Sequence, residues 1–189
     1  MKYRYMDAPQ PLRDYFVYME TILGKSSKTV DEYFLDLRTF FRYIKYAKGF
    51  VADDISFSDI DISDVTLDMI EQVTLSDVYD YLNYTVRDRK NAAAARARKV
   101  SSLRSFYKYL SNKACVIKHN PVAELEYPKL NKSLPKYLEI DECIRLLDAV
   151  NETSDSYPFK VRDYAILVLF LNCGMRLSEL VGINLNDIQ

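Results

Sequence analysis

Apolar residues recur at helical spacing along most of the 189-residue chain. The clearest stripe runs from Val30 to Ile44, where apolar side chains return every three or four positions, as on one face of a helix. Similar stripes predict helices over 11–23, 77–87, 91–110 and 139–150, and a short helix near 67–70. Thr29 with Glu32 reads as a capping box, and Ser76 as the cap of helix 77–87. The pattern predicts a mainly α protein.

A different apolar pattern lies near the C-terminal end. Residues 164–171 form an unbroken apolar run, long enough for a buried helix. Gly174 follows as the natural C′ residue, because glycine takes the left-handed conformation without a Cβ penalty. Arg176 then begins the next helix, with Glu179 at i+3 and within side-chain reach. We expect a helix–glycine–helix corner that holds a guanidinium at a buried hinge. On these residues alone, a structural or solvated arginine is the simpler interpretation of Arg176.

Prolines divide the chain. The segment 115–136 contains Asn120-Pro121, Pro128 and Leu134-Pro135 together with several lysines, and proline both stops helices and stiffens the chain. We therefore expect a helical domain over 1–114, a basic interdomain linker over 115–136, and the N-terminal piece of a second domain over 137–189.

Charge is distributed unevenly, although the net charge is only −1. Residues 85–136 hold 13 Lys or Arg against three Asp or Glu, whereas 1–84 carry a net −6 and 137–189 a net −5. A basic middle between acidic ends is typical of a site for a polyanion. The alternative, a solvated charged face, would suit a single helix better than a block of this length.

The predicted helix 91–110 is the best candidate for contacting DNA. Ala92 to Ala95 are small, and a helical wheel places Arg98 and Ser105 nearly opposite the apolar face, with Ser101 and Ser102 beside them. Small residues let a helix approach a groove, while cations and hydroxyls bind phosphate or guanine. The predicted DNA-contacting residues are Arg89, Lys90, Arg96, Arg98, Lys99, Ser102 and Lys132. For the cations near 87–90, complementing a helix C-terminus is also a sufficient explanation.

Several kinds of site are not indicated. The three cysteines are widely spaced without a C-x-x-C pair, and the one histidine, His119, lies in the predicted linker. Neither a zinc site nor a disulfide framework is suggested, so we expect no metal, no cofactor and a reducing cytoplasm. No apolar run of 18 residues and no signal-peptide pattern occurs, so we expect no membrane association.

Four ordered motifs resemble those of one family. Residues 173–180, C-G-M-R-L-S-E-L, resemble the first arginine motif of tyrosine site-specific recombinases (phage integrases and Xer-like recombinases), roughly T-G-x-R-[ILV]-S-E-L. Residues 98–110 are similar to the family's R-x-L-S-A-L-R-x-F-Y-x-Y-L helix, 120–138 to its N-P and L-P-x-x-L linker steps, and Arg162-Asp163 to its R-D. The resemblance implies a SAM-like helical core-binding domain, followed by the first helices of a mixed α/β catalytic domain.

The resemblance also implies a function. Family members cut and rejoin double-stranded DNA at a specific recombination site through a 3′-phosphotyrosyl intermediate, without a cofactor and as tetramers. It makes Arg176 a catalytic phosphate ligand and Glu179 its support, while Cys173 departs from the usual threonine. The family's later lysine, H-x-x-R motif and nucleophilic tyrosine do not follow in this chain, so we expect a DNA-binding portion that is inactive alone. A stand-alone DNA-binding truncated integrase and a helical protein-interaction module are the alternatives.

Overall fold

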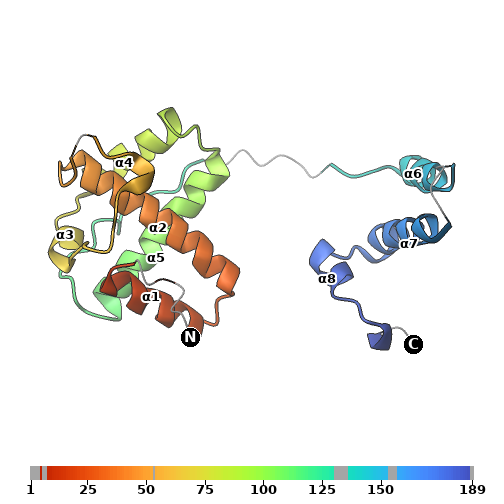
Figure 1. Ribbon diagram of the computed structural model, residues 1–189, viewed down its shortest axis with the longest axis horizontal. Helices are drawn as coiled ribbons and strands as arrows, with labels where there is room; N and C mark the ends of the chain where they lie inside the picture. The colour runs from red at the N-terminus through yellow and green to blue at the C-terminus, as the bar shows by residue number, and fades with distance from the viewer. Residues whose placement is uncertain (1–4, 6–7, 53, 130–135, 153–156, 188–189) are drawn as a thin grey trace. The chain divides into compact units, whose positions relative to one another are not determined.

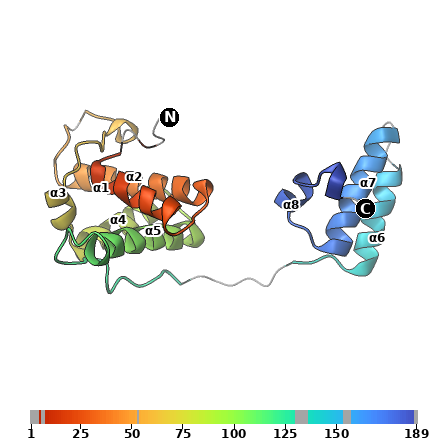
Figure 2. The same cartoon turned by 90° about the horizontal axis from the view of Figure 1, so that it is seen from below.

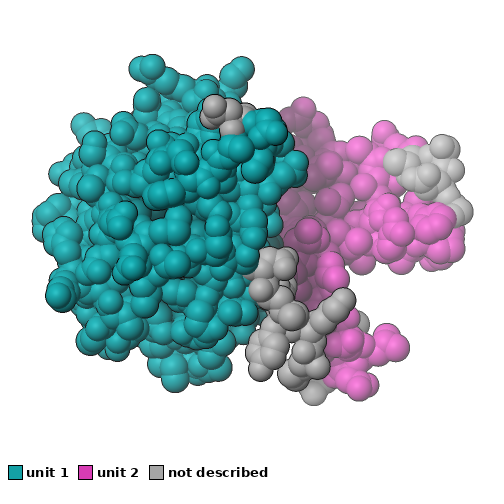
Figure 3. Space-filling model, turned by 60° about the vertical axis from the view of Figure 1, so that its left-hand side comes forward, with its two compact units in different colours: residues 1–131 teal, residues 132–189 magenta. Residues whose placement is uncertain are grey.

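The computed structural model describes Tyr5 and residues 8–52, 54–129, 136–152 and 157–187. It divides into two compact units, unit 1 over Met1–Asn131 and unit 2 over Lys132–Gln189, which Figure 3 distinguishes by colour. The described residues form helices, turns and loops, and no strand occurs among them. The mainly α fold predicted from the apolar pattern is confirmed.

Unit 1 is a bundle arranged around one long helix. Its helices are α1 (Gln10–Thr21), α2 (Ser27–Ala47), α3 (Leu67–Glu71), α4 (Leu75–Arg87) and α5 (Ala93–Asn112), with a 3-10 turn η1 at Phe57–Asp59. Figures 1 and 2 show α2 running through the unit, where it packs against α1, α4 and α5. Helix α1 also contacts α5, so the two longest helices are covered on several sides.

The core of unit 1 is rich in aromatic rings. The apolar stripe predicted on α2 is buried, including Leu37, Phe40 and Phe41. Phe40 meets Tyr81 of α4 edge to face with ring centroids 5.1 Å apart. Edge-to-face contacts of this kind stabilise beyond the area that the rings bury. The stripe therefore fixes the positions of α4 and α5 on α2.

Two predicted helix caps are wrong by two or three residues. Helix α2 is capped by Ser26, whose Oγ accepts a hydrogen bond from the Thr29 amide at 3.3 Å. Helix α4 is capped by Thr74 rather than Ser76, with Thr74 Oγ1 accepting from the Asp77 amide at 3.2 Å. Asp77 in turn accepts from the Thr74 amide at 2.8 Å. This reciprocal pair satisfies two helix-end donors, which a cap at Ser76 would leave open.

The first part of the predicted linker packs onto unit 1. Ile117, Val122 and Leu125 are buried in its core. Arg104 of α5 donates a hydrogen bond to the carbonyl oxygen of Leu125 at 2.5 Å, and its guanidinium lies 5.4 Å from the ring centroid of Tyr127. The expected linker residues 115–127 therefore include core positions. Residues 130–135, and with them the predicted DNA contact Lys132, lie outside the described residues.

Unit 2 consists of α6 (Ile140–Glu152), α7 (Tyr157–Cys173), α8 (Leu177–Val181) and a 3-10 turn η2 (Leu185–Asp187), with α6 packed against α7. The expectation that 164–171 forms a buried helix is half right. The helix is present as the second half of α7, but none of its residues is fully buried. The second half of α7 is apolar on all sides, and a helical segment of that kind needs neighbours on more than the one side that α6 covers.

Candidate nucleic-acid interface

The strongest cationic feature of unit 1 lies where α4 ends and α5 begins. We name it the α4–α5 corner, and it consists of Arg87, Arg89, Lys90 and Arg96. The first three side chains are exposed and Arg96 is half-buried. Among the described residues, no carboxylate forms an ion pair with any of the four. Positive charge that is not neutralised within the fold is available to an anion.

The N-terminus of α5 adds backbone donors at the same corner. Its N-cap residue, Ala92, supplies no side-chain acceptor, and the first turn carries no acidic residue. The first amides of the helix, beginning at Ala93, are therefore uncapped. Helix N-termini carry a partial positive charge and bind phosphates through such amides. The corner thus combines side-chain cations with an open helix N-terminus in a 20-residue helix.

Arg98 and Lys99 belong to an ion cluster that joins α5 to α2. Arg98 Nη1 lies 2.6 Å from Asp36 Oδ2 and 2.9 Å from Glu32 Oε2, and Lys99 Nζ lies 2.7 Å from Asp36 Oδ1. The Asp36 side chain is 1% exposed and that of Lys99 is 10% exposed. Burial raises the pKa of Asp36, while the hydrogen bond from Lys99 and the charges of Lys99 and Arg98 oppose the rise. The cluster positions α5 on α2.

The predicted outer-face positions of Lys99 and Ser102 are wrong. Both are buried, and the Ser102 hydroxyl donates to the carbonyl oxygen of Lys99 at 2.9 Å. The physical reason is that α2 packs against this side of α5, where the carboxylate of Asp36 compensates the buried ammonium. Arg98 is only half-buried. Its side chain is 36% exposed and forms ion pairs with two carboxylates.

Besides the α4–α5 corner, unit 1 has a groove along the outer face of α5. It has a volume of about 600 Å³, and its lining includes Ser101, Arg104, Ser105 and Lys108. None of the described residues that line it carries a carboxylate. The Ser105 hydroxyl accepts a hydrogen bond from Tyr15 at 2.7 Å, so it is already engaged within the fold. This groove extends the polar, cationic character of α5 beyond the α4–α5 corner.

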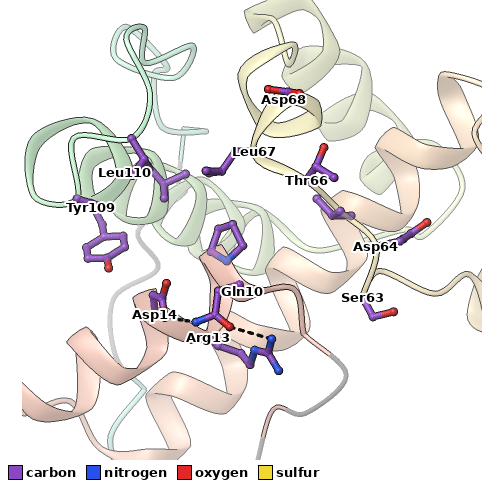
Figure 4. Close-up of a pocket in the computed structure, with 14 residues that line it drawn as sticks. Gln10, Arg13, Asp14, Ser63, Asp64, Thr66, Leu67, Asp68, Tyr109 and Leu110 are labelled. Carbon is purple, nitrogen blue, oxygen red and sulfur yellow. Dashed lines mark hydrogen bonds between the residues drawn. The ribbon is translucent and has the colours of Figure 1, made fainter.

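Another groove of unit 1, with a volume of about 670 Å³, is acidic rather than cationic. Figure 4 shows it between α1, the start of α3 and the end of α5, with Asp14, Asp64 and Asp68 around it. Gln10 links Asp14 and Arg13 of α1, donating to Asp14 at 2.6 Å and accepting from Arg13 at 2.9 Å. Three carboxylates around a single arginine disfavour a phosphate ligand, so this groove is a poor candidate for contacting DNA.

The corner around Arg176 has the predicted local geometry. Gly174 has φ +60° and donates its amide to the carbonyl oxygen of Phe170 at 3.1 Å, as a C′ glycine should. Glu179 accepts from the Arg176 amide at 2.7 Å and forms an ion pair with its Nη1 at 2.9 Å. The carboxylate therefore both caps α8 and orients the guanidinium.

The expected burial of this hinge is wrong, because the Arg176 side chain is 82% exposed. Its neighbours Leu177 and Val181 on α8 are exposed as well, so none of the described residues of unit 2 covers the corner. Glu179 engages one end of the guanidinium, and the remaining N–H donors are open to a phosphate.

Two residues that shape the candidate interface were not predicted from the sequence. Arg87 joins the corner, but its position at a helix C-terminus had a sufficient local explanation. Asp36 is the carboxylate that organises the ion cluster, and its signal was an acidic residue beside the apolar stripe of α2. In the part of the chain that is described, no group of His, Cys, Asp or Glu side chains is arranged to hold a metal. None of the described helices has both the length and the apolar character that crossing a membrane requires.

Comparison with known families places a domain in unit 1. Residues 61–114 match the family described as phage integrase, N-terminal SAM-like domain. This range includes α3, α4 and α5, and therefore the whole α4–α5 corner.

Whole-chain relatives extend the match. The chain is 51% identical over 181 residues to the tyrosine recombinase XerC of Caldanaerobacter subterraneus. The matched segment covers 96% of this chain and 50% of that protein. It is 37% identical over 132 residues to XerC of Alcanivorax borkumensis, covering 65% of this chain and 42% of that protein. Against XerD of Listeria monocytogenes the identity is 29% over 178 residues, 94% of this chain and 52% of that protein. The chain spans about half the length of these relatives. No solved structure matches it.

Proposed function

Because the chain belongs with the tyrosine recombinases and matches their N-terminal part, we propose that unit 1 binds double-stranded DNA at a recombination site. The α4–α5 corner carries this proposal. It offers four cations without carboxylate partners among the described residues, and an uncapped helix N-terminus inside the matched SAM-like domain. These groups contact phosphates and set the register of the protein on the duplex.

The predicted contact set changes accordingly. Arg89, Lys90 and Arg96 remain direct contacts and Arg87 joins them, while Arg98 contributes through its exposed part. Lys99 and Ser102 support the interface from within the fold, because both are buried. Lys132 lies outside the described residues and stays in the set for its charge and its place in the basic segment.

Arg176 is the proposed catalytic residue of unit 2. A planar guanidinium can bond two phosphoryl oxygens at once and stabilise the charge that develops on them during strand cleavage. Glu179 is the positioning residue, since it holds the guanidinium from one side at 2.9 Å. In this proposal Arg176 binds the scissile phosphate, and a tyrosine hydroxyl forms the 3′-phosphotyrosyl bond while the 5′-hydroxyl leaves.

The 189-residue chain alone is proposed to bind DNA without cleaving it. Its single histidine, His119, is followed by Asn120, Pro121 and Val122, so the sequence contains no H-x-x-R motif to supply the second arginine. The relatives are recombinases, and we propose that strand exchange proceeds in a tetramer of such protomers on paired sites, in the cytoplasm.

Duplex binding by the chain tests the function directly. Fluorescence anisotropy with a labelled duplex should show binding that weakens when Lys90→Ala and Arg96→Ala are combined. The matched control is Lys113→Ala with Lys118→Ala, which removes the same charge from exposed lysines at the other end of α5 and beyond.

We expect at least a tenfold loss of affinity for the first pair and less than a threefold loss for the control. Equal losses would mean that only net charge matters and would reject the corner as the interface. A nicked suicide duplex should trap no covalent complex, and a trapped complex would reject the inactivity of the chain alone.

A further inference from the structure

A groove lined by aromatic rings lies on unit 1 beside the α4–α5 corner, and Arg89 is the corner residue that contacts one of its rings. It has a volume of about 640 Å³ and is formed by the second half of α2, one face of α4 and the segment 55–57. Its rings are Tyr43, Tyr46, Phe57 and Tyr84, and we name it the tyrosine groove. Tyr46 is 58% exposed, so the groove presents a ring that the core does not need.

Three of these rings form a continuous row. The centroids of Tyr43 and Tyr84 are 5.1 Å apart with an interplanar angle of 31°, and those of Phe57 and Tyr84 are 5.5 Å apart. At the end of the row, the guanidinium carbon of Arg89 lies 5.7 Å from the Phe57 centroid. The chain therefore already places one arginine against this row, in the geometry of a cation–π contact.

Negative charge surrounds the rings. Asp80 and Asp88 line the groove and are exposed. Burial raises the pKa of Tyr43, and the negative charges of Asp80, Asp77 and Asp88 raise it further. Lys48 forms an ion pair with Asp77 at 3.0 Å, whereas no ion pair among the described residues engages Asp80 or Asp88. The two lining carboxylates thus keep their charge for a ligand.

We propose that the tyrosine groove binds an arginine side chain of a basic peptide segment in a protein partner. The ring faces attract a cation, and the carboxylates complete its neutralisation. Arginine fits better than lysine, because its planar guanidinium stacks on rings and is more weakly hydrated than an ammonium. A nucleic acid is disfavoured, since its phosphates would meet Asp80 and Asp88. None of the residues that line the groove is a proposed DNA contact, so the proposal does not depend on the DNA function.

Peptide binding can be followed by the tryptophan fluorescence of the peptide, because the chain itself contains no tryptophan. The probe is a short peptide with two arginines and one tryptophan, whose fluorescence is followed as protein is added. The control peptide replaces both arginines with citrulline, which keeps the shape and removes the charge. We expect the arginine peptide to bind at least tenfold more tightly than the citrulline peptide.

Protein variants then locate the site. Tyr46→Ala, and separately Asp80→Asn with Asp88→Asn, should each weaken the arginine peptide at least fivefold. The control pair Asp14→Asn with Asp68→Asn removes two exposed carboxylates from the groove of Figure 4 and should change affinity less than twofold. Duplex affinity should be unchanged by Tyr46→Ala, which separates this site from the α4–α5 corner.

Four results would overturn the proposal. They are equal affinity for the two peptides, equal weakening by the control pair, competition by a single-stranded oligonucleotide, and concentration-dependent self-association that Tyr46→Ala abolishes. The last result would assign the groove to a second copy of the chain.

Discussion

Replacing Lys99 with methionine isolates the ion cluster that holds α5 on α2. Methionine keeps most of the side-chain volume and removes the ammonium, so the change deletes the 2.7 Å bond to Asp36 without opening a large cavity. A hydrogen bond between charged groups contributes about 1.5–3 kcal/mol when its partner is left buried. Asp36 is 1% exposed and retains only Arg98, so we expect a loss of about 2 kcal/mol in the free energy of unfolding.

Urea unfolding, followed by near-ultraviolet circular dichroism of the aromatic core, measures this loss. With a slope of about 2 kcal/mol per molar urea, the midpoint should fall by about 1 M. Arg96→Met is the matched control, because it removes one positive charge from the same helix where the described residues include no ion-pair partner. It should cost less than about 0.5 kcal/mol, as surface substitutions do.

The pH dependence of the difference has a definite sign. The hydrogen bond from Lys99 is the largest contribution that lowers the pKa of Asp36, so its removal raises that pKa further above the ordinary value of 3.8. A carboxyl with a raised pKa takes up its proton more readily in the folded state. The penalty of Lys99→Met, relative to the native chain, should therefore shrink as pH falls through the raised pKa towards 3.8. Equal midpoints at neutral pH, or a penalty that grows on acidification, would refute this reasoning.

Two further substitutions test local features. Gly174→Ala should destabilise the helix corner by about 1 kcal/mol through backbone strain alone, because φ is +60° and an added Cβ would meet nothing within 4 Å. Hydrogen exchange of the amides in α7 and α8 measures this loss, and unchanged exchange rates would contradict the prediction. Arg104→Ala should make residues 117–127 several-fold more sensitive to protease, because the Leu125 carbonyl loses its hydrogen-bond donor and the Tyr127 ring loses its stacked guanidinium. Lys108→Ala on the same helix is the control. Equal cleavage rates for the two variants would show that Arg104 does not anchor the segment.

The features that were predictable from sequence are local ones. Gly174, Arg176 and Glu179 interact across one helix turn, so their spacing fixed the glycine conformation and the ion pair. The buried stripe of α2 followed from helical periodicity alone. Both depend on residues within a few positions of one another.

The features that were missed depend on a neighbouring helix. A helical wheel gives the direction of Lys99 but not what lies there, and Asp36 on α2 makes its burial possible. The prolines of 115–136 argued against a helix, and the described residues 115–129 contain none, yet Ile117, Val122 and Leu125 are buried by contacts that no local pattern encodes. The exposure of Arg176 likewise reflects how little of unit 2 covers α8, which its own motif does not reveal.

The salt dependence of duplex binding tests the central proposal most directly. If the four cations of the α4–α5 corner each contact a phosphate, the logarithm of the association constant should fall with the logarithm of salt concentration at a slope of about −3.6. Affinity should then drop about 150-fold between 50 and 200 mM salt. Combining Lys90→Ala with Arg96→Ala should reduce the slope to about −1.8, because two phosphate contacts are lost. A flat salt dependence, or the same slope in this double variant as in the native chain, would contradict the assignment of the corner as the DNA interface.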